Sequence, residues 1–328
     1  MRYLITGATG FIGPYLIRRL TDLGHTCRCL IRSGSDISAL DGYDVEFVTG
    51  DITEAESLVN IGEGTDCLVH MATLGHMSNF AVSEAQFDAV NVQGTVNIMK
   101  VALDSGVKKI VHCSTVAAMG ICPDIPATEE SACHPHHSYG RSKLRAEKEV
   151  LRMVKENGLP AVIIRFSMVY GPGDRRDMLK LVRMAKRGLF PKIGKGTKLT
   201  PLIHAEDVVS GILAAAERGI TGEIYLITNP RSERFDDIRK IIQEALGVYR
   251  TELYIPEWAA LAIASVIEKT FSLVGKTPPV FRKNIESTLA DRVFSIEKAK
   301  KELGFNTKID PCAGIKETVI WYKEKGWI

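Results

Sequence analysis

The sequence predicts an α/β protein in which a doubly wound parallel sheet is accompanied by a smaller, mostly helical region. Through the first half of the 328 residues, short apolar runs alternate with stretches of helical periodicity, which is typical of a parallel sheet covered by helices on both faces. After about residue 228 the pattern becomes mainly helical. A glycine-rich turn follows the first apolar run, where such sheets join a strand to a helix.

The expected elements follow from length and apolar periodicity. The expected strands are Arg2–Thr6, Thr26–Ile31, Val45–Thr49, Cys67–His70, Lys109–Cys113, Ala161–Phe166 and Glu223–Thr228. The expected helices are Ile12–Leu23, Glu84–Ser105, Tyr139–Asn157, Arg234–Leu246, Glu257–Val274, Arg282–Asp291 and Ser295–Leu303. We assign residues 1–170 and about 200–228 to the sheet domain, and about 171–199 and 229–328 to the second domain.

The composition is that of an ordinary globular protein. With 42 Lys and Arg residues against 39 Asp and Glu residues, the net charge of +3 gives no case for a nucleic-acid partner. The longest apolar run, Trp258–Ile267, is shorter than the roughly 20 residues of a membrane span. We interpret it as a helix that is buried, lies over a pocket or at most touches a membrane surface, and we favour burial. The seven cysteines form no disulfide framework, and Cys133-His134-Pro135-His136-His137 lacks a second cluster of metal ligands. We therefore expect a cytoplasmic protein with reduced thiols and no metal site.

The glycine-rich turn Gly7-Ala8-Thr9-Gly10-Phe11-Ile12-Gly13 joins the first expected strand to the first expected helix. Glycines permit a tight turn and a close approach of the backbone to a pyrophosphate, whose charge is attracted by the free N–H groups of a helix N-terminus. Two residues separate each pair of glycines, which departs from the commoner dinucleotide fingerprint. The position between strand and helix nevertheless indicates a dinucleotide site.

The end of the second expected strand indicates which dinucleotide binds. It reads Ile31-Arg32-Ser33, and no carboxylate that could hold the adenosine ribose of NAD appears before Asp36. Arg32 instead suits the 2′-phosphate of NADP, so we expect NADP(H) to be preferred over NAD(H). Asp51 follows the third expected strand and could accept a hydrogen bond from the adenine amino group.

Tyr139 and Lys143 are four residues apart at the start of an expected helix, so the phenol and the ammonium share one face. A free tyrosine has a pKa of about 10 and is a poor base at neutral pH. A nearby ammonium and a cationic nicotinamide would lower that pKa. Ser114 and Thr115 carry two hydroxyls just past the fifth expected strand, and one of them could hold a substrate oxygen beside the phenol.

As a set, these segments resemble the extended short-chain dehydrogenase/reductase family, also described as NAD-dependent epimerases and dehydratases. The resemblance extends from the N-terminus to about Asn229. The segments that carry it are Thr6–Gly13, His70-Met71-Ala72, Asn91-Val92-Gln93-Gly94-Thr95, Thr115 with Ser114 beside it, Tyr139 with Lys143, Arg165–Pro172 (RFSMVYGP) and His204–Val208.

The resemblance implies a seven-stranded Rossmann domain and hydride transfer between a nicotinamide and a substrate carbon. Tyr139 would exchange a proton with the substrate oxygen, Thr115 would hydrogen-bond that oxygen, and Lys143 would bind the nicotinamide ribose and lower the pKa of the phenol. Asn91 would help to hold the lysine. Together with the positions argued above, the expected cofactor-binding residues are Gly7, Thr9, Gly10, Phe11, Ile12, Gly13, Arg32, Asp51, Ile52, Met71, Ala72, Tyr139, Lys143, Phe166 and Met168.

Two segments bear on the branch of this family. Val116-Ala117-Ala118 follows Thr115 where dehydratase members carry an Asp-Glu pair, which argues against dehydration. The stretch Lys198–His204 lacks the Arg-Asp pair with which many nucleotide-sugar epimerases grip a diphosphate. We therefore favour a dehydrogenase or reductase of a bulky secondary alcohol or ketone, similar to dihydroflavonol-reductase-like and 3β-hydroxysteroid-dehydrogenase-like members.

The alternatives are a nucleotide-sugar epimerase that uses bound NAD, and an inactive cofactor-sensing regulator. Nine Lys and Arg residues between Arg175 and Lys198 could attract the anionic substrate of an epimerase, or could form a solvated helix face. The resemblance also suggests a homodimer through the helices Glu84–Ser105 and Tyr139–Asn157. The expected partner is a small-molecule substrate.

Overall fold

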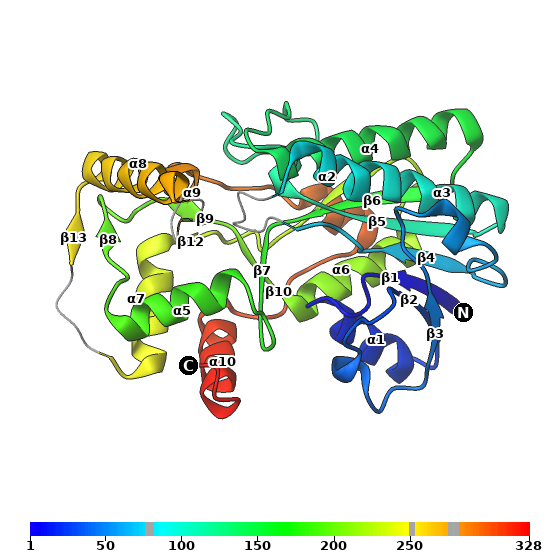
Figure 1. Ribbon diagram of the computed structural model, residues 1–328, viewed down its shortest axis with the longest axis horizontal. Helices are drawn as coiled ribbons and strands as arrows, with labels where there is room; N and C mark the ends of the chain where they lie inside the picture. Colours follow the sequence, from blue (N-terminus) through cyan, green and yellow to red (C-terminus); the bar gives the residue numbers. More distant parts are fainter. Residues whose placement is uncertain (76–81, 249–252, 275–277, 279–281) are drawn as a thin grey trace.

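The computed structural model describes residues 1–75, 82–248, 253–274, 278 and 282–328 (Figure 1). Its central feature is a seven-stranded parallel sheet with the strand order β11-β6-β5-β4-β1-β2-β3. The strand order changes direction between β1 and β4, and doubly wound sheets bind ligands at the C-terminal ends of strands at such a point. The predicted fold class is confirmed.

The strands of the sheet coincide closely with the expected segments. They are β1 (Arg2–Thr6), β2 (Thr26–Ile31), β3 (Val45–Thr49), β4 (Cys67–His70), β5 (Lys109–Thr115), β6 (Ala161–Phe166) and β11 (Ile224–Ile227). The helices around the sheet are α1 (Gly13–Asp22), α2 (Glu84–Asp88), the π-helical turn η3 (Ala89–Gln93), α3 (Gly94–Asp104), α4 (Ser138–Asn157) and α6 (Ala205–Arg218).

Helices cover both faces of the sheet, and each face has its own hydrophobic cluster (Figure 1). On one face, Leu16 of α1 and Ile212 of α6 join the strand residues. On the other face, Ile98 of α3 and Val150 of α4 do the same. Because central strands such as β4 and β6 are buried on both sides, their sequences are mainly apolar runs and not alternating patterns. The edge strand β3 is more exposed.

A second region lies beyond the C-terminal ends of the strands (Figure 1). Its elements are α5 (Asp177–Arg187), β8 (Lys192–Ile193), β9 (Leu199–Thr200), β12 (Glu233–Arg234), α7 (Phe235–Leu246), β13 (Tyr254–Ile255), α8 (Glu257–Leu273), α9 (Arg282–Thr288) and α10 (Pro311–Glu324). Val182 of α5, Ile242 of α7 and Val319 of α10 belong to a separate hydrophobic cluster. The paired short strands β7 (Met168–Tyr170) and β10 (Leu202–His204) lie between the two regions.

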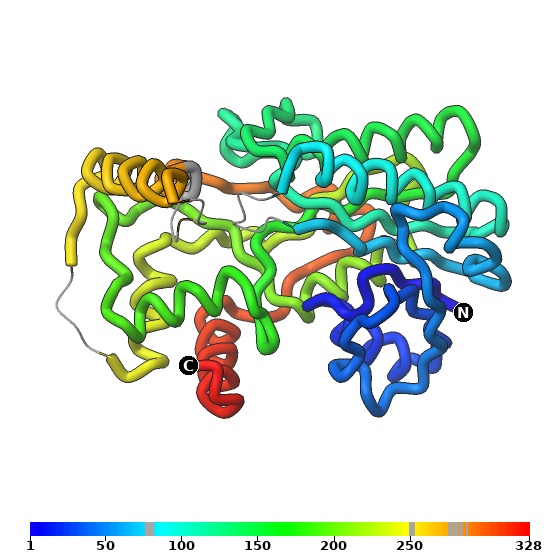
Figure 2. The backbone as a smooth tube through the Cα atoms, in the orientation of Figure 1, coloured from blue at the N-terminus to red at the C-terminus, as the bar shows by residue number. Residues whose placement is uncertain are grey.

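The chain passes between the regions more than once, as the tube in Figure 2 shows. It leaves the seven-stranded sheet after β6, passes through β7 into the second region and returns through β10 and α6 to β11, after which it leaves again. The π-helical turn η5 (Ala299–Leu303) then packs against the sheet, where Leu303 and Phe305 join the cluster of α1 and α6. This segment falls in the stretch that we assigned to the second domain, and the division into domains stays a prediction.

The interpretation of Trp258–Ile267 as a buried helix is wrong. The segment lies in α8, where only Ala260 and Ala264 are buried, while Trp258 is 75% exposed and Val266 is 63% exposed. The stretch has few polar residues, so its sequence pattern could not show which side faces solvent. Within the described ranges, none of the helices combines the length and apolarity required to cross a membrane. The helix expected over Arg282–Asp291 ends earlier, at Thr288.

Candidate active site

The glycine-rich turn lies at the C-terminal end of β1, and at Gly7 and Gly13 there is no room for a side chain. A Cβ on Gly7, whose φ is +75°, would lie 2.8 Å from the backbone N of Ala72, and a Cβ on Gly13 would lie 1.8 Å from the carbonyl O of Ala8. No side chain caps α1. The N–H of Gly13 donates to the carbonyl O of Gly10 at 3.1 Å and Pro14 has no N–H, so an anion here would be attracted mainly by the positive end of the helix dipole. The other residues expected at the phosphates are exposed or half-buried: Thr9, Gly10, Phe11 and Ile12.

At the ends of β2 and β3 the structure places Arg32 within electrostatic reach of Asp51. The Arg32 side chain is exposed. Burial raises the pKa of Asp51, but hydrogen bonds from the N–H and hydroxyl of Thr53, at 2.8 and 2.7 Å, and the charge of Arg32 together hold it below its usual value. The carboxylate is therefore ionised at neutral pH. Its role toward adenine stays a prediction.

The segment after β4 is held against the first turn. The N–H of Met71 donates to the carbonyl O of Thr6 at 3.1 Å, and the N–H of Ala72 donates to the Thr6 hydroxyl at 3.1 Å. Ile52 is buried, and its carbonyl O accepts from the side-chain amide of Asn97 in α3 at 2.9 Å. The turns after β1, β3 and β4 are therefore fixed by the packing of the sheet and its helices.

Asn91, in the π-helical turn η3, is buried and fully bonded. Its Oδ1 accepts from the Thr73 hydroxyl at 2.9 Å and from the N–H of Leu74 at 2.8 Å. Its Nδ2 donates to the carbonyl O of Leu74 at 3.1 Å and to the Ser142 hydroxyl at 2.9 Å. Asn91 thus joins the segment after β4 to the helix that carries Tyr139 and Lys143.

Tyr139 lies in the first turn of α4, which His137 caps by accepting the N–H of Gly140 at 2.9 Å. The His137 ring stacks on the tyrosine ring, with 6.1 Å between the centroids. The phenol hydroxyl is hydrogen-bonded to the hydroxyls of Thr73 and Thr115, which come from the ends of β4 and β5. Thr115 also accepts the N–H of Ala117 at 3.2 Å, which fixes the position of its hydroxyl oxygen.

The electrostatic surroundings of the phenol are set mainly by burial, which raises the pKa of Tyr139 to about 12. Arg176, from the second region, is the charge that opposes this shift most strongly, and the hydrogen bonds to Thr73 and Thr115 act in the same direction as Arg176. In this state the phenol is neutral and is suited to donate a proton. To accept one at neutral pH it needs a further cation beside it.

Lys143 is buried one helical turn after Tyr139. Its ammonium donates to the carbonyl O of Cys113 at 2.9 Å. Burial lowers the pKa of Lys143 to about 8, while the nearby Glu147 acts to raise it. The side chain is therefore mostly protonated at neutral pH and is held at the end of β5.

The structure separates Ser114 from this group of hydroxyls. Neighbouring residues of a strand point to opposite faces, and the buried Ser114 hydroxyl donates to Glu147 of α4. Glu147 also pairs with Arg165 of β6 at 2.7 Å, and both side chains are almost completely buried. Ser114 therefore contributes to a buried ionic cluster, whereas Thr115 faces the phenol.

Comparison with known proteins shows the family to which the chain belongs. The family model for the NAD dependent epimerase/dehydratase family matches residues 3–228. The chain belongs to the NAD dependent epimerase/dehydratase family. It is 31% identical to sterol demethylase protein B of Methylococcus capsulatus over 100% of both chains, and 28% identical to a putative dihydroflavonol 4-reductase of Synechocystis over 99% of this chain and 96% of that one. The structure of the dTDP-glucose 4,6-dehydratase DesIV of Streptomyces venezuelae, with NAD and TYD bound, superposes with a TM-score of 0.81 at 25% identity, covering 100% of this chain and 98% of that one.

The residues present fit the nicotinamide cofactor that the family binds. The cradle at Gly7 and Gly13 and the uncapped start of α1 suit a pyrophosphate. Phe166, at the end of β6, and Met168, at the start of β7, are half-buried where β7 leaves the sheet. The individual contacts of these residues with a cofactor stay predictions.

Two groups that act on the phenol at this site were not expected from the sequence. Thr73 and Arg176 act on the phenol, and His137 caps the helix that carries it. Thr73 comes from a strand end without any motif of its own. The order of the strands could have indicated it, because the segments after β4 and β5 lie side by side.

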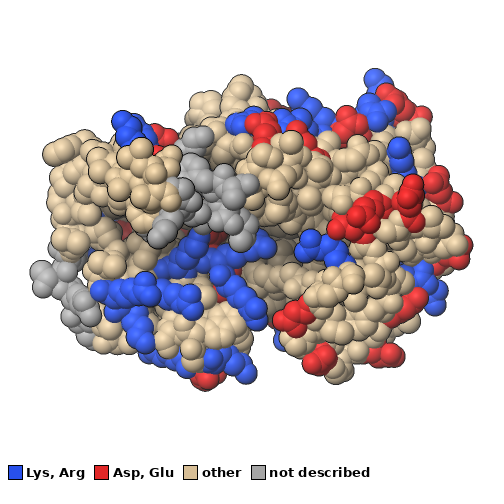
Figure 3. Space-filling model, in the orientation of Figure 1, with Lys and Arg blue, Asp and Glu red and all other residues tan. Residues whose placement is uncertain are grey.

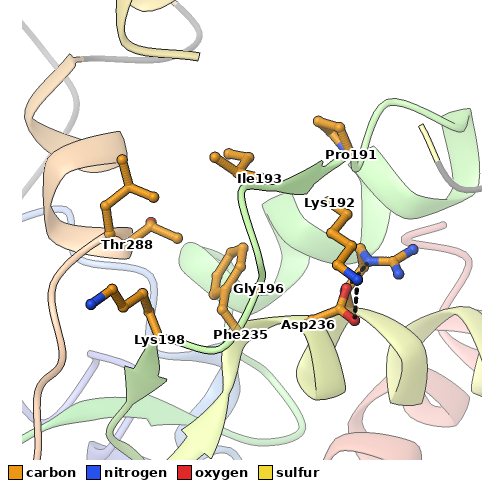
Figure 4. Close-up of a pocket in the computed structure, with 10 residues that line it drawn as sticks. Pro191, Lys192, Ile193, Gly196, Lys198, Phe235, Asp236 and Thr288 are labelled. Atoms are coloured by element: carbon orange, nitrogen blue, oxygen red, sulfur yellow. Dashed lines mark hydrogen bonds and ion pairs between the residues drawn. The ribbon is translucent and has the colours of Figure 1, made fainter. Parts of the chain in front are cut away.

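Basic side chains gather over α5 beside the hollow between the two regions (Figure 3). Further along the second region is a pocket lined by residues of β8, α7 and the end of α9, including Ile193, Phe235 and Leu289 (Figure 4). Asp236 in this pocket pairs with Arg239 at 2.8 Å and lies 4.0 Å from the ammonium of Lys192. Tyr139 does not line this pocket.

Proposed function

We propose that the protein is an NADP(H)-preferring oxidoreductase of the extended short-chain type, acting on a secondary alcohol or ketone of a bulky substrate. The observation that carries the proposal is the convergence of three hydroxyls, those of Tyr139, Thr115 and Thr73, at the C-terminal ends of β4 and β5. The segment after β4 and the turn after β1 that would hold the cofactor are hydrogen-bonded to each other.

In this proposal each side chain has a separate task. When bound, the nicotinamide supplies or accepts the hydride. Tyr139 gives a proton to the substrate oxygen during reduction and takes it back during oxidation. Thr115 holds that oxygen, and Asn91 positions Thr73, whose hydroxyl contacts the phenol. Lys143, with its charge held at the end of β5, would bind the nicotinamide ribose.

The surroundings of Thr115 favour simple hydride transfer over elimination. An elimination needs a further acid or base beside the substrate. Val116 and Ala118 follow Thr115 and are buried apolar residues, so the short helical turn after β5 supplies no carboxylate. The resemblance to a sterol demethylase protein and to a dihydroflavonol reductase also supports a bulky, partly apolar substrate.

The preference for NADP(H) rests on Arg32, whose exposed side chain forms no hydrogen bond or ion pair within the described residues. Titration calorimetry with NADP⁺ and NAD⁺ tests it. We expect tighter binding of NADP⁺, and an Arg32→Ser variant should lose that preference while keeping its affinity for NAD⁺. Tighter binding of NAD⁺ to the wild-type protein would contradict the assignment.

The activity itself is tested by following NADPH absorbance with a panel of alicyclic and aromatic ketones, and NADP⁺ reduction with the matching alcohols. Turnover of at least one bulky substrate supports the proposal. Binding of the dinucleotide without turnover of any substrate in the panel would support a cofactor-sensing regulator instead.

A nucleotide-sugar epimerase is the second candidate, because basic residues gather beside the hollow between the regions (Figure 3). Incubation with UDP-glucose and UDP-glucuronic acid, followed by separation of the sugar nucleotides, distinguishes the two candidates. Formation of an epimer without net consumption of a dinucleotide would favour the epimerase.

For the quaternary structure we propose a homodimer through α2, α3 and α4. On that surface Arg141 and Arg145 of α4 pair with Glu84 of α2, so part of it is already bonded within one chain. Analytical ultracentrifugation tests the proposal, and a monomer at micromolar concentration would contradict it.

A further inference from the structure

Two arginines in the turn between β7 and α5, Arg175 and Arg176, form no ion pair within the described part of the chain. Both side chains are exposed. Arg175 lies over the ring of Trp327, with 5.0 Å between its guanidinium carbon and the ring centroid. Two neighbouring cations without acidic partners favour an anionic ligand.

The turn that carries these arginines is held against the expected cofactor site. The Tyr15 hydroxyl, in α1, donates to the carbonyl O of Pro172 at 2.6 Å. A Cβ on Gly173 would lie 3.9 Å from the ring of Phe11 in the glycine-rich turn. The turn therefore lies beside the N-terminus of α1, where the pyrophosphate is expected.

The conformation of the turn is also fixed from within. The buried Asp174 accepts the N–H of Arg176 at 2.8 Å and the N–H of Met178 at 3.0 Å. The Tyr322 hydroxyl, from α10, donates to the carbonyl O of Asp174 at 2.6 Å. The two arginines are thus presented by a rigid backbone.

The arginines extend in different directions from this turn. The Arg176 guanidinium lies against Gly75, where a Cβ would be 2.9 Å from its Nη1, and its charge reaches the phenol of Tyr139. The hydrogen bonds to Ser38 are the main cause of the lowered pKa of Asp36, in the loop after β2, and the charge of Arg175 acts in the same direction. Gly75 follows β4 and Asp36 follows β2, so the pair spans the groove at the C-terminal end of β1.

We propose that Arg175 and Arg176 form a clasp that the second region places over the cofactor groove, with Arg176 binding the dinucleotide pyrophosphate and Arg175 strengthening the positive potential toward the adenosine. The proposal rests on the proposed function only in requiring that a pyridine dinucleotide binds. A guanidinium suits this ligand because its paired N–H donors match phosphate oxygens.

The test measures binding by titration calorimetry in the absence of any reducible substrate. The ligands are NADP⁺, ADP-ribose, which keeps the pyrophosphate but lacks nicotinamide, and adenosine 2′-phosphate, which lacks the pyrophosphate. The variants are Arg176→Gln, Arg176→Lys and Arg175→Gln. Lys186→Gln removes the same charge from the exposed far end of α5 and serves as the matched control.

We expect Arg176→Gln to weaken the binding of NADP⁺ and of ADP-ribose by about 10- to 100-fold, which is typical of the loss of a hydrogen bond to a charged group. Adenosine 2′-phosphate should be affected much less. Arg176→Lys should fall between the wild type and Arg176→Gln, Arg175→Gln should have a smaller effect, and Lys186→Gln should bind like the wild type. Added salt should weaken NADP⁺ binding by the wild type more than NADP⁺ binding by Arg176→Gln.

Equal ADP-ribose affinity in the wild type and Arg176→Gln would overturn the clasp while leaving the proposed function intact. Unchanged cofactor affinity together with a raised KM for the substrate would assign Arg176 to a substrate anion, which also overturns it. If the wild-type protein bound neither NADP⁺ nor ADP-ribose, the proposed function and the clasp would both fail. Because Arg176 is exposed, unchanged melting temperatures should show that the variants are folded.

Discussion

Polar groups differ between two regions of the molecule. Those at the C-terminal ends of β4 and β5 are hydrogen-bonded to one another, whereas charged groups of the second region are exposed. At the strand ends, Asn91, Thr73, Tyr139 and Thr115 are joined by hydrogen bonds. In the second region, Arg175 and Arg176 are exposed and form no ion pair with a described residue. Apolar side chains of α8 such as Trp258 and Val266 also lie in solvent.

This difference separates two requirements of an enzyme. Groups that move a proton must already be in place, since orientation before the reaction lowers the barrier. Groups that recognise a ligand must instead be free to exchange water for the ligand. Substitutions at or behind the strand ends should therefore change catalysis or stability, whereas substitutions on the second region should mainly change binding or have little effect.

The largest expected effect is on turnover. Tyr139→Phe removes only the hydroxyl, so we expect kcat to fall about 10²- to 10⁴-fold, the contribution typical of a positioned acid or base. Dinucleotide affinity and the melting temperature should stay near those of the wild type. Tyr254→Phe, in the exposed strand β13, is the matched control and should leave kcat unchanged. Retained turnover in Tyr139→Phe would refute the role of the phenol.

The next effect concerns the ionic cluster behind the site. Glu147→Ala leaves the buried Arg165 without its partner, and we expect the free energy of unfolding to fall by about 3–5 kcal/mol. Glu149→Ala, in the same helix, removes the exposed partner of Arg152 and should cost about 1 kcal/mol or less. Urea denaturation measures both. Equal losses of unfolding free energy in the two variants would contradict the expectation that the buried ionic cluster contributes more to stability than the surface ion pair.

A pair of leucines compares the two regions directly. Leu303 packs completely buried against the sheet, and Leu303→Ala should lower the free energy of unfolding by about 2–5 kcal/mol. Leu273, at the end of α8, is 88% exposed, and Leu273→Ala should stay within about 0.5 kcal/mol of the wild type. A large loss in Leu273→Ala would mean that this end of α8 is covered in solution.

The smallest expected effect is a dependence on pH. Burial raises the pKa of the Tyr139 phenol to about 12, so the phenolate fraction increases with pH through the neutral range. Alcohol oxidation needs the phenolate, and its kcat/KM should rise with pH, whereas kcat/KM for ketone reduction should not. Because Arg176 favours the phenolate, Arg176→Gln should move the rising limb to higher pH. Oxidation that slows as the pH rises through neutrality would contradict this assignment.

The sheet and the glycine-rich turn could be predicted from the sequence because their signals are local. Strands buried on both sides are short apolar runs, and a turn that excludes side chains must contain glycine at positions such as Gly7 and Gly13. Tyr139 and Lys143 are also close in sequence, on one face of one helix. Contacts of this kind need no knowledge of how distant segments meet.

The rest of the site depends on distant contacts. Thr73 and Arg176 reach the phenol only because the sheet and the second region bring separate segments together. Strand alternation could have separated Ser114 from Thr115, since only one of two neighbouring residues can face the phenol. The exposure of α8 could not be read from a helix with few polar residues to mark a solvent-facing side.

The crowding around Gly7 and Gly13 has a consequence for how coenzyme preference can change. A methyl group at either position would collide with the backbone, so variation there would disturb the fold itself. Arg32, by contrast, is exposed at the end of β2 and supports no packing. On the proposed role of Arg32, coenzyme preference can therefore be changed by substitution at the end of β2, whereas Gly7 and Gly13 cannot be replaced without disturbing the backbone.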